Sequence, residues 1–230
     1  VSCGGTWCGY CSSPPRYLCD DSECRWCFEK SFASSDMARY WSIQNKLSPR
    51  KVFKNSCTKY LFYCQSCHHT FDSTLVNVSN DRWCPYCAHQ KLCSSDDCLF
   101  CFKNSFASSD KARYWSEFNS EKPRGVFKST PTKYYFDCDI CGHTFDIRLS
   151  DISQQDQWCG YCSSQRELCR DSECKWCFEK SFASLPQAKY WSTRNLVSPR
   201  QVRRATPDKY LFDCDTCKHT FKSSPRDIYN

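Results

Sequence analysis

Nine Cys-x-x-Cys pairs occur in this chain of 230 residues, which contains 23 cysteines. Two thiols at this spacing can hold one metal ion from a tight turn, and zinc is the first choice for thiolate ligands. A redox pair is normally single and lies in a βαβ setting, which this sequence lacks. Disulfides among the remaining cysteines are the second alternative. We therefore expect a protein held together by Zn²⁺.

Two groups of four cysteines have the spacing of a structural zinc site. The first group has the pattern Cys-x2-Cys-x16-Cys-x2-Cys, and the second repeats it with seventeen intervening residues. The groups are Cys64, Cys67, Cys84 and Cys87, and then Cys138, Cys141, Cys159 and Cys162. Four thiolates complete the tetrahedral shell of a structural zinc ion. We expect one zinc site in each group.

The other paired cysteines leave their metal shells incomplete. The pair Cys8 and Cys11 lacks an upstream pair, and Cys214 and Cys217 lack a downstream one, so we expect the two pairs to be partners of one another or to be completed by sequence outside this chain. A pattern of three cysteines, Leu-Cys-x4-Cys-x2-Cys, also recurs. Its members are Cys19, Cys24 and Cys27; Cys93, Cys98 and Cys101; and Cys169, Cys174 and Cys177. Cys3 and Cys57 occur in one repeat each and are expected to be free thiols or local additions.

These cysteines belong to a repeat of about 75 residues. The segment "CFEKSFASSDMARYWS" returns as "CFKNSFASSDKARYWS" and "CFEKSFASLPQAKYWS", and "KYLFYCQSCHHTF" returns as "KYYFDCDICGHTF" and "KYLFDCDTCKHTF". Self-similarity at a fixed period indicates a repeat architecture. We divide the chain into residues 1–77, 78–151 and 152–230. Because the first repeat starts and the last one ends in the middle of a cysteine module, we expect a stretch of a longer array, a processed fragment, or half-modules that meet.

Short elements must position these cysteines. "KYLFYC" alternates like a strand, "CQSC" is a turn, and "HHTFDSTLVNVS" returns as a second strand. "WCPYCAHQKLC" is expected to open a short helix, and "SSDMARYWS" predicts another from about residue 35 to 43. A knuckle, a hairpin and a helix that carries the second cysteine pair make up a treble-clef zinc finger. The sequence predicts a small zinc-stabilised α+β fold of tandem modules.

The pattern "YWS...N...PR.V...KY.F.C..C.HTF......WC.YC" resembles the treble-clef zinc-finger repeats of large DNA viruses, and it covers the chain three times. The resemblance implies this fold and a viral origin rather than an activity. It also implies a histidine after "SFAS" as the fourth ligand of the three-cysteine sets. This chain departs from that pattern with Ser35, Ser109 and Leu185, which leaves water, a carboxylate such as Asp36 or Asp110, or no fourth ligand.

Three histidines follow the knuckles at one fixed place, namely His69, His143 and His219. We favour a structural histidine that is hydrogen-bonded near the knuckle over a metal ligand. Some treble-clef relatives are nucleases that use a histidine, but no second catalytic residue recurs at fixed spacing here. A metal-dependent nuclease is therefore the least favoured function.

The aromatic residues have two readings. Tyr40 and Trp41, with their counterparts at 114, 115, 190 and 191, could stack on bases, but small modules also need large aromatic side chains for a core. We favour the core. Trp7, Trp83 and Trp158 are expected to shield the adjacent zinc thiolates.

The formal net charge overstates how positive the metal-loaded protein would be. The formal net charge is +7, but a zinc ion with four thiolates carries −2, so full metal loading would bring the total to about −2. A local patch could still follow a nucleic acid backbone through Arg50, Arg124 and Arg200. The equal alternative is that these arginines order the segment between helix and hairpin.

We expect a non-enzymatic zinc-binding scaffold that presents a surface to other proteins, such as capsid or assembly proteins of a virus particle, with head-to-tail self-association as one option. The alternative is a nucleic-acid-binding zinc-finger array. No stretch has the pattern of a signal peptide or reaches membrane-spanning length. We place the protein in the virion or in the host cytoplasm or nucleus, not outside the cell.

Overall fold

The computed structural model describes residues 8–229, so that Cys3 and Trp7 lie outside the described residues. Contacts divide the chain into two compact units. Unit 1 covers the described part of Val1–Ser108 together with Pro123–Phe127, and unit 2 covers Ser109–Lys122 and the described part of Lys128–Asn230. Each unit is described by itself.

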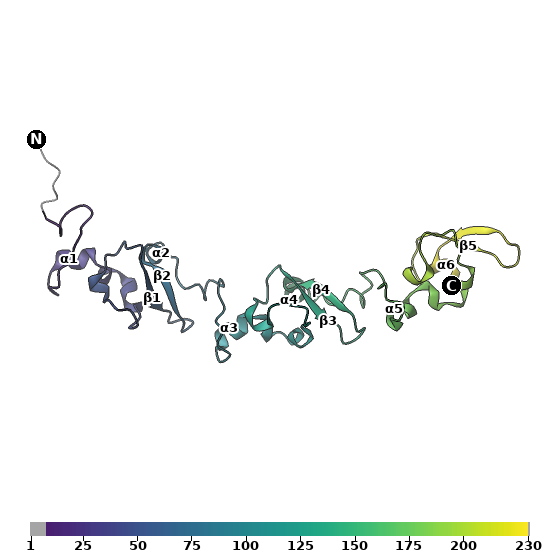
Figure 1. Cartoon of the computed structure of the whole chain (residues 1–230), viewed down its shortest axis with the longest axis horizontal. Coiled ribbons are helices and arrows are strands. Elements are labelled where there is room, and N and C mark those ends of the chain that lie inside the picture. Colours follow the sequence, from purple (N-terminus) through teal and green to yellow (C-terminus); the bar gives the residue numbers. More distant parts are fainter. Residues whose placement is uncertain (1–7, 230) are drawn as a thin grey trace, which may run out of the picture. The chain divides into compact units, whose positions relative to one another are not determined.

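Unit 1 contains one hairpin and a series of short helices (Figure 1). The hairpin is β1 (Lys59–Tyr63) and β2 (Thr70–Thr74), followed directly by α2 (Leu75–Ser79). The other α-helices are α1 (Arg25–Lys30) and α3 (Leu99–Asn104). The 3-10 helices are η1 (Phe32–Ser34), η2 (Asp36–Tyr40), η3 (Pro49–Lys51), η4 (Phe106–Ser108) and η6 (Pro123–Gly125).

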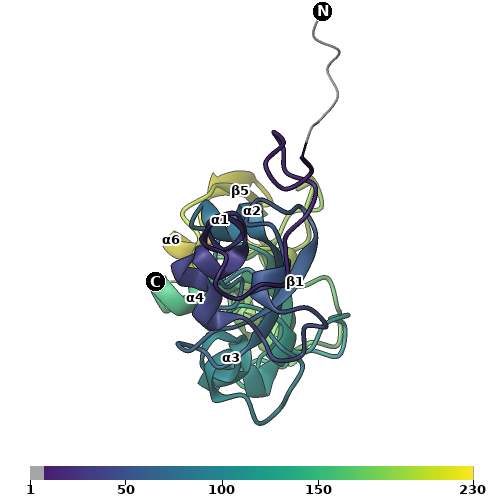
Figure 2. The same ribbon diagram turned by 90° about the vertical axis from the view of Figure 1, so that its left-hand side faces the viewer.

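Unit 2 contains two hairpins, and its elements can be followed from two directions (Figures 1 and 2). The first hairpin is β3 (Lys133–Asp137) and β4 (Thr144–Arg148), and the second is β5 (Tyr210–Asp213) and β6 (Thr220–Ser223). The α-helices are α4 (Leu149–Gln155), α5 (Lys175–Lys180) and α6 (Pro225–Tyr229). The 3-10 helices are η5 (Asp110–Tyr114), η7 (Phe182–Ser184), η8 (Pro186–Tyr190) and η9 (Pro199–Gln201).

Each hairpin places two phenylalanines opposite one another. Phe62 pairs with Phe71 in the antiparallel register of β1 and β2, and Phe136 pairs with Phe145 between β3 and β4. Alternate residues of a strand face the same side, so these rings form one apolar face beside the cysteine turn. The third hairpin pairs Phe212 with Phe221 in the same way. The hairpins therefore present the same combination of an aromatic face and a Cys-x-x-Cys turn.

The turn after each hairpin's first strand is a tight knuckle. In the first, the Cys64 amide donates to the His69 carbonyl over 2.9 Å, and the His68 amide donates to the Cys64 carbonyl over 2.8 Å. The residue after the second cysteine is left-handed at His68 (φ 58°), Gly142 (φ 68°) and Lys218 (φ 62°). Glycine adopts this conformation without steric cost, whereas the other two residues are strained. The knuckle geometry is thus kept even where the sequence does not favour it.

Aromatic side chains form the core of unit 1. Phe32, Phe62 and Leu75 have no exposed surface. The ring of Trp41 lies 5.6 Å from Phe62 and 4.8 Å from Tyr60, and its Nε1 donates to the Leu47 carbonyl over 2.9 Å. This packing confirms the core interpretation of the Tyr-Trp pairs.

The predicted short elements lie where the sequence placed them, but three of them differ in type or length. The helix expected at 35–43 is the shorter 3-10 helix η2, which is capped by the Ser35 hydroxyl. The second strand stops at Thr74, because the Thr74 side chain accepts from the Asn77 amide and starts α2. Residues 83–93 form turns instead of a helix. The left-handed backbone of His89 (φ 53°) ends the turn and sends the chain toward Cys93.

Among the described residues, no helix is both long enough and apolar enough to cross a membrane.

Candidate metal centres

The four-cysteine groups predicted from spacing converge in space. In unit 1 the Cys64 and Cys87 sulfurs lie 3.6 Å apart, and those of Cys67 and Cys84 lie 3.4 Å apart. The knuckle of the hairpin supplies the first pair, and the turn after Trp83 supplies the second. In unit 2 the corresponding distances are 3.6 Å for Cys138 and Cys162 and 3.5 Å for Cys141 and Cys159. We call these two groups the four-cysteine centres.

These distances suit zinc. Thiolates at about 2.3 Å from a tetrahedral ion lie about 3.8 Å from one another, whereas a disulfide requires about 2.05 Å. The cysteines among the described residues are free thiols. Three members of the first centre, Cys64, Cys67 and Cys84, are at most 4% exposed. Four converging sulfurs without bonds between them, three of them on buried residues and the fourth on the half-buried Cys87, are the arrangement of a closed structural zinc site.

Each of two three-cysteine sets acquires a histidine from the preceding hairpin. His69 Nε2 lies 3.4 Å from the sulfurs of both Cys98 and Cys101, and Cys93 belongs to the same group of ligand atoms within 4.8 Å. His143 Nε2 lies 3.4 Å from the sulfurs of Cys174 and Cys177, and Cys169 completes that group. We call these the histidine centres. A nitrogen and a sulfur on one zinc ion lie about 3.6 Å apart, so the distances fit.

The interpretation of His69 and His143 as structural histidines was therefore wrong. Each imidazole faces the sulfurs of the next repeat instead of forming a hydrogen bond beside its own knuckle. The carboxylates named from the sequence as fourth-ligand candidates, Asp36 and Asp110, do not enter these groups in the described part of the chain. One signal was available: each repeat holds three cysteines that need a ligand and one histidine in a fixed place without a role.

A tyrosine stacks on each of these imidazoles. The rings of His69 and Tyr86 lie 4.0 Å apart and 13° from parallel, and those of His143 and Tyr161 lie 4.1 Å apart at 15°. The tyrosine sits inside the second cysteine pair of the neighbouring four-cysteine centre. Phe100 adds an edge-on contact to His69 at 6.0 Å. The two kinds of centre are therefore joined by packed side chains.

The tryptophans beside the second cysteine pairs pack on the hairpins. Trp83 lies 5.0 Å from Phe71 and 5.7 Å from Phe62, and Trp158 lies 5.0 Å from Phe145. These contacts place each ring on the aromatic face of its hairpin. The side chains thereby hold the turn with the second cysteine pair against the knuckle.

The remaining predicted ligands are not brought into a complete group. Cys19, Cys24 and Cys27 cluster with their ligand atoms within 4.8 Å of one another, without a fourth ligand among the described residues. Cys8, Cys11, Cys214 and Cys217 enter no group of three or more ligands within residues 8–229. His219 is exposed, and so is Cys57.

The recurrent arginines support the three-cysteine loops. The Arg50 Nη2 donates to the Asp21 carbonyl over 2.9 Å and lies 3.9 Å from the Cys19 sulfur. Arg124 and Arg200 repeat this arrangement, each at 2.7 Å from a loop carbonyl, that of Ser95 and Asp171 respectively. All three side chains are half-buried. This geometry favours the ordering role over the nucleic acid contact.

Hydrogen bonds divide the thiols of each centre into more and less acidic groups. Burial opposes ionisation of Cys93, but hydrogen bonds with the His69 side chain, the Ser95 backbone and the neighbouring thiols together outweigh burial and lower its pKa to about 6. Burial raises the pKa of Cys101 in the same centre to about 11. In the first four-cysteine centre, burial opposes ionisation of Cys64, but hydrogen bonds from backbone amides and from the Cys67 and Cys87 thiols lower its pKa to about 7. Binding of a cation would therefore release protons from the remaining thiols.

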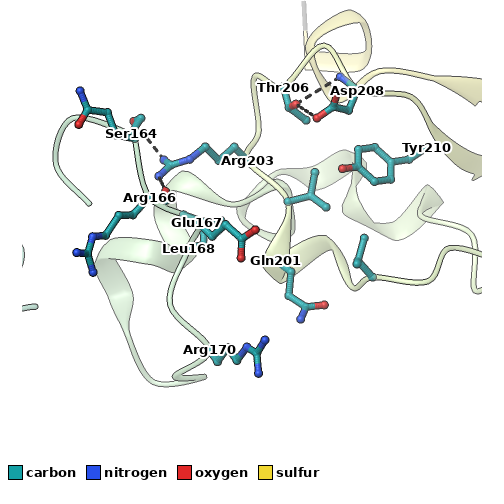
Figure 3. Close-up of a pocket in the computed structure, with 13 residues that line it drawn as sticks. Ser164, Arg166, Glu167, Leu168, Arg170, Gln201, Arg203, Thr206, Asp208 and Tyr210 are labelled. Carbon is teal, nitrogen blue, oxygen red and sulfur yellow. Dashed lines mark hydrogen bonds between the residues drawn. The ribbon is translucent and has the colours of Figure 1, made fainter. Parts of the chain in front are cut away.

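Unit 2 also has a surface cavity of about 520 Å³ that three arginines line (Figure 3). Figure 3 shows Arg203 reaching toward Ser164 and Arg166, where it donates to the Ser164 hydroxyl over 3.2 Å and to the Arg166 carbonyl. Arg166 pairs with Asp146. Two of the three guanidinium groups are thus engaged inside the protein, which leaves Arg170 alone to attract an anion.

Comparison with known proteins agrees with this architecture. Residues 37–90 match a family described as "Probable Treble clef zinc finger domain". The matched segment contains the first four-cysteine centre and His69. The chain is also similar to an uncharacterized protein of Acanthamoeba polyphaga mimivirus, with 38% identity over 215 residues. The alignment covers 91% of this chain and 52% of the mimivirus protein, so the chain spans about half the length of that relative.

Proposed function

We propose that this chain, which matches a treble-clef zinc-finger family over residues 37–90 and is similar to a mimivirus protein, is a non-enzymatic scaffold whose repeats are joined by zinc. The observation that carries this proposal is the origin of the ligands. His69 belongs to the finger matched at residues 37–90, whereas Cys93, Cys98 and Cys101 follow that finger. The histidine centre would therefore fasten one module to the next.

Zinc is the ion that these ligands suit. Cys64, Cys67, Cys84 and Cys87 would hold one ion, and Cys138, Cys141, Cys159 and Cys162 a second. His69 with Cys93, Cys98 and Cys101, and His143 with Cys169, Cys174 and Cys177, would hold two more. Bound zinc contributes charge neutralisation and fixed geometry, and closed sites of four protein ligands are structural rather than catalytic.

Two features support a role without catalysis, and a third, the net charge, argues against binding of nucleic acid. The complete centres leave no ligand position for a substrate or for an activated water. His69 and His143, which a nuclease of this fold would need, face three sulfurs each. The protein with zinc bound is close to electrically neutral, because each four-thiolate site carries about −2 and each histidine centre about −1. A nucleic-acid-binding array is the weaker alternative, since Arg50, Arg124 and Arg200 are engaged in their own loops.

The partners that we propose are other proteins, such as those of the particle or the assembly machinery of a large DNA virus, and the similarity to a mimivirus protein supports the viral setting alone. Single apolar side chains are exposed after the 3-10 helices, such as Ile43, Phe118 and Leu196, and would add contact area for such partners.

The test combines metal analysis with binding and cleavage assays on the purified zinc-loaded chain. We expect four tightly held zinc ions, loss of the folded state on chelation, and no DNA or RNA affinity with a steep dependence on salt. Salt-sensitive binding at physiological ionic strength would favour the nucleic-acid array. Magnesium-stimulated cleavage that is lost in His69→Ala and His143→Ala would overturn the non-enzymatic assignment.

A further inference from the structure

The second strand of the first hairpin has an open outer edge. On the other strand, Leu61 turns its backbone groups away from β2, because its amide donates to Asn45 Oδ1 over 2.9 Å and its carbonyl accepts from the Ser42 amide over 3.0 Å. Opposite residues of an antiparallel pair exchange both backbone hydrogen bonds or neither. Asp72, the partner of Leu61, therefore points its backbone groups toward the outer edge of β2. Its carbonyl accepts no hydrogen bond from the described residues.

The second hairpin has the same edge, but an arginine covers it. Tyr135 is hydrogen-bonded on its outer side as Leu61 is, so its partner Asp146 also faces outward. Here Arg166 Nη2 donates to the Asp146 carbonyl over 2.6 Å, and the two side chains form an ion pair. A guanidinium group thus satisfies the carbonyl that is open in the first hairpin.

Lys91 takes the place of Arg166 in the first hairpin. The Lys91 amide donates to the Pro85 carbonyl over 3.2 Å, and the Arg166 amide donates to the Gly160 carbonyl over 3.0 Å. Both acceptors directly follow the first cysteine of a pair, so the two donors are equivalent. An ammonium group lacks the planar fork that lets arginine bind two oxygens together. Lys91 is exposed, and its ammonium makes no hydrogen bond with the described residues. The edge therefore stays open.

A groove of about 580 Å³ lies beside this open edge. Its lining comes from β2 and from the turn with the second cysteine pair, and it includes Phe71, Asp72, Ser73, Trp83, Pro85 and Lys91. We call this cavity the β2 groove. Its volume is in the range of ligand-binding pockets. Backbone hydrogen-bonding groups, aromatic rings and a cation are therefore gathered at one surface.

The charge of the β2 groove is positive. Lys59 and Asp72 line it and pair with one another over 2.8 Å, so their charges offset. The other charged lining residues are Arg82, Lys91 and Asp81, which leaves a surplus of one positive charge. Arg82 and Lys91 are both exposed. An acidic group on a partner is the electrostatic complement of this lining.

We propose that the β2 groove binds an extended, acidic peptide segment of a partner protein, which adds a strand to the outer edge of β2. An exposed strand edge is a template for pairing, and main-chain hydrogen bonds supply the affinity of strand addition. The segment would donate to the Asp72 carbonyl and place its acidic side chain near Lys91. In the second hairpin, Arg166 would exclude such a segment. This inference rests on the proposed scaffold function, because it names the kind of partner that one surface of the scaffold holds.

The test follows binding of a defined probe to the zinc-loaded full chain by nuclear magnetic resonance. The probe is a five-residue peptide, threonine–valine–glutamate–valine–threonine, with both ends blocked. We expect the probe to shift the amide signals of β2 around Asp72 and to bind with a Kd of about 1 mM or tighter.

Exchange of the two equivalent residues provides the matched variants. Lys91→Arg should weaken binding at β2 by about 10-fold or more, because the guanidinium competes for the Asp72 carbonyl. Arg166→Lys should open the second hairpin and add probe-induced shifts around Asp146. Lys46→Arg is the control, since Lys46 is exposed and does not line the groove. It should bind the probe as the wild type does.

Three results would overturn the proposal. The first is the absence of shifts around Asp72 at millimolar probe. The second is equal binding of a probe whose amides are all N-methylated, because it would show an anion site without strand addition. The third is self-association of the wild type that Lys91→Arg abolishes, because it would assign the edge to a second copy of the chain. In each case, zinc retained at the four complete centres would leave the scaffold standing, whereas loss of that zinc would reject the scaffold itself.

Discussion

The histidine centre at Cys93 and the three-cysteine cluster at Cys19 are built from nearly the same sequence, yet among the described residues an imidazole contacts only the first of them. Their loops have the same internal hydrogen bonds, at 3.3 Å between the Cys93 amide and the Cys101 sulfur and at 3.4 Å between Cys19 and Cys27. The supporting arginines donate to equivalent carbonyls at 2.7 and 2.9 Å. The loop is therefore specified locally, and its geometry does not depend on the histidine.

What the histidine adds is a link to another module. His69 is half-buried between Tyr86, Phe100 and two sulfurs, and it comes from a hairpin 24 to 32 residues earlier in the chain. The comparison shows that the three-cysteine loop forms its three-ligand site by itself. The knuckle histidine of another module would supply the fourth metal ligand and so connect the two modules.

Removal of the metal should unfold both the centre at Cys93 and the cluster at Cys19. This is the largest effect that we expect. A chelator should unfold the chain, because structural zinc supplies about 10 kcal/mol or more of folding free energy in small modules. Aromatic and cysteine packing alone is too thin to replace it. Far-UV and near-UV circular dichroism during titration with a chelator checks this, and readdition of zinc is the control. Retention of the near-UV signal without zinc would show that the core holds itself together.

Replacement of His69 should turn the complete centre into a copy of the incomplete one. In His69→Ala the linker residues 88–98 should lose their protection against hydrogen exchange, because a missing ligand weakens the local zinc by about 100-fold or more. The four-cysteine centre beside it should stay intact. His68→Ala is the matched control, since the His68 side chain is exposed and, within the described residues, its one hydrogen bond is with the Tyr63 hydroxyl at 2.8 Å. Equal exchange in both variants would contradict the role of His69.

The supporting arginines should matter equally in both regions. Arg124→Ala and Arg50→Ala should each lower the free energy of unfolding by about 1–3 kcal/mol, because a charged donor to a loop carbonyl is lost from a half-buried site. Thermal unfolding of the zinc-loaded variants measures this. Arg113→Ala, on the exposed face of η5, is the control with an expected change below about 0.5 kcal/mol. A large effect at Arg124 with none at Arg50 would mean that the loop depends on the imidazole after all.

The smallest effect concerns the carboxylates of the hairpins. Asp146 contacts Lys133 and Arg166, and these hydrogen bonds lower its pKa from 3.8 to about 2, whereas the equivalent Asp72 pairs with Lys59. Because the pKa is lower in the folded protein, the ionised carboxylate stabilises the fold above pH 3.8. This stabilisation is lost only as the pH falls toward 2. Asp146→Asn should therefore cost about 1–2 kcal/mol, discounted for partial exposure. The cost should be the same at pH 7 and pH 5.5, and Asp72→Asn should cost less. A cost that shrinks between these pH values would contradict the assignment.

Much of this architecture follows from spacing alone. Four thiols in two close pairs can close only around one ion, so the four-cysteine groups and the hairpins between them were predictable from Cys64 to Cys87. Whether a short segment forms a strand, a helix or a turn was harder to predict, because a single residue can determine it. The Thr74 hydroxyl ends a strand and starts α2, and the left-handed His89 turns an expected helix into a loop.

The histidine centres were missed for a different reason. When ligands are assigned within a single repeat, the four cysteines around the knuckle already complete one metal site. No site is then left for His69 to join. The partner lies in the next repeat, brought near by the packing of Trp83 and Tyr86 on the hairpin and on the imidazole. Ligation across a junction is a tertiary property, which spacing inside a repeat does not reveal.

The most direct test of the central claim is a count of zinc ions by native mass spectrometry, in the wild-type chain and in a variant with both His69→Ala and His143→Ala. Two kinds of centre, one of cysteines alone and one completed by histidine, predict that the variant holds two ions fewer than the wild type while it keeps those of the four-cysteine centres. Equal zinc content in the two proteins would contradict the account.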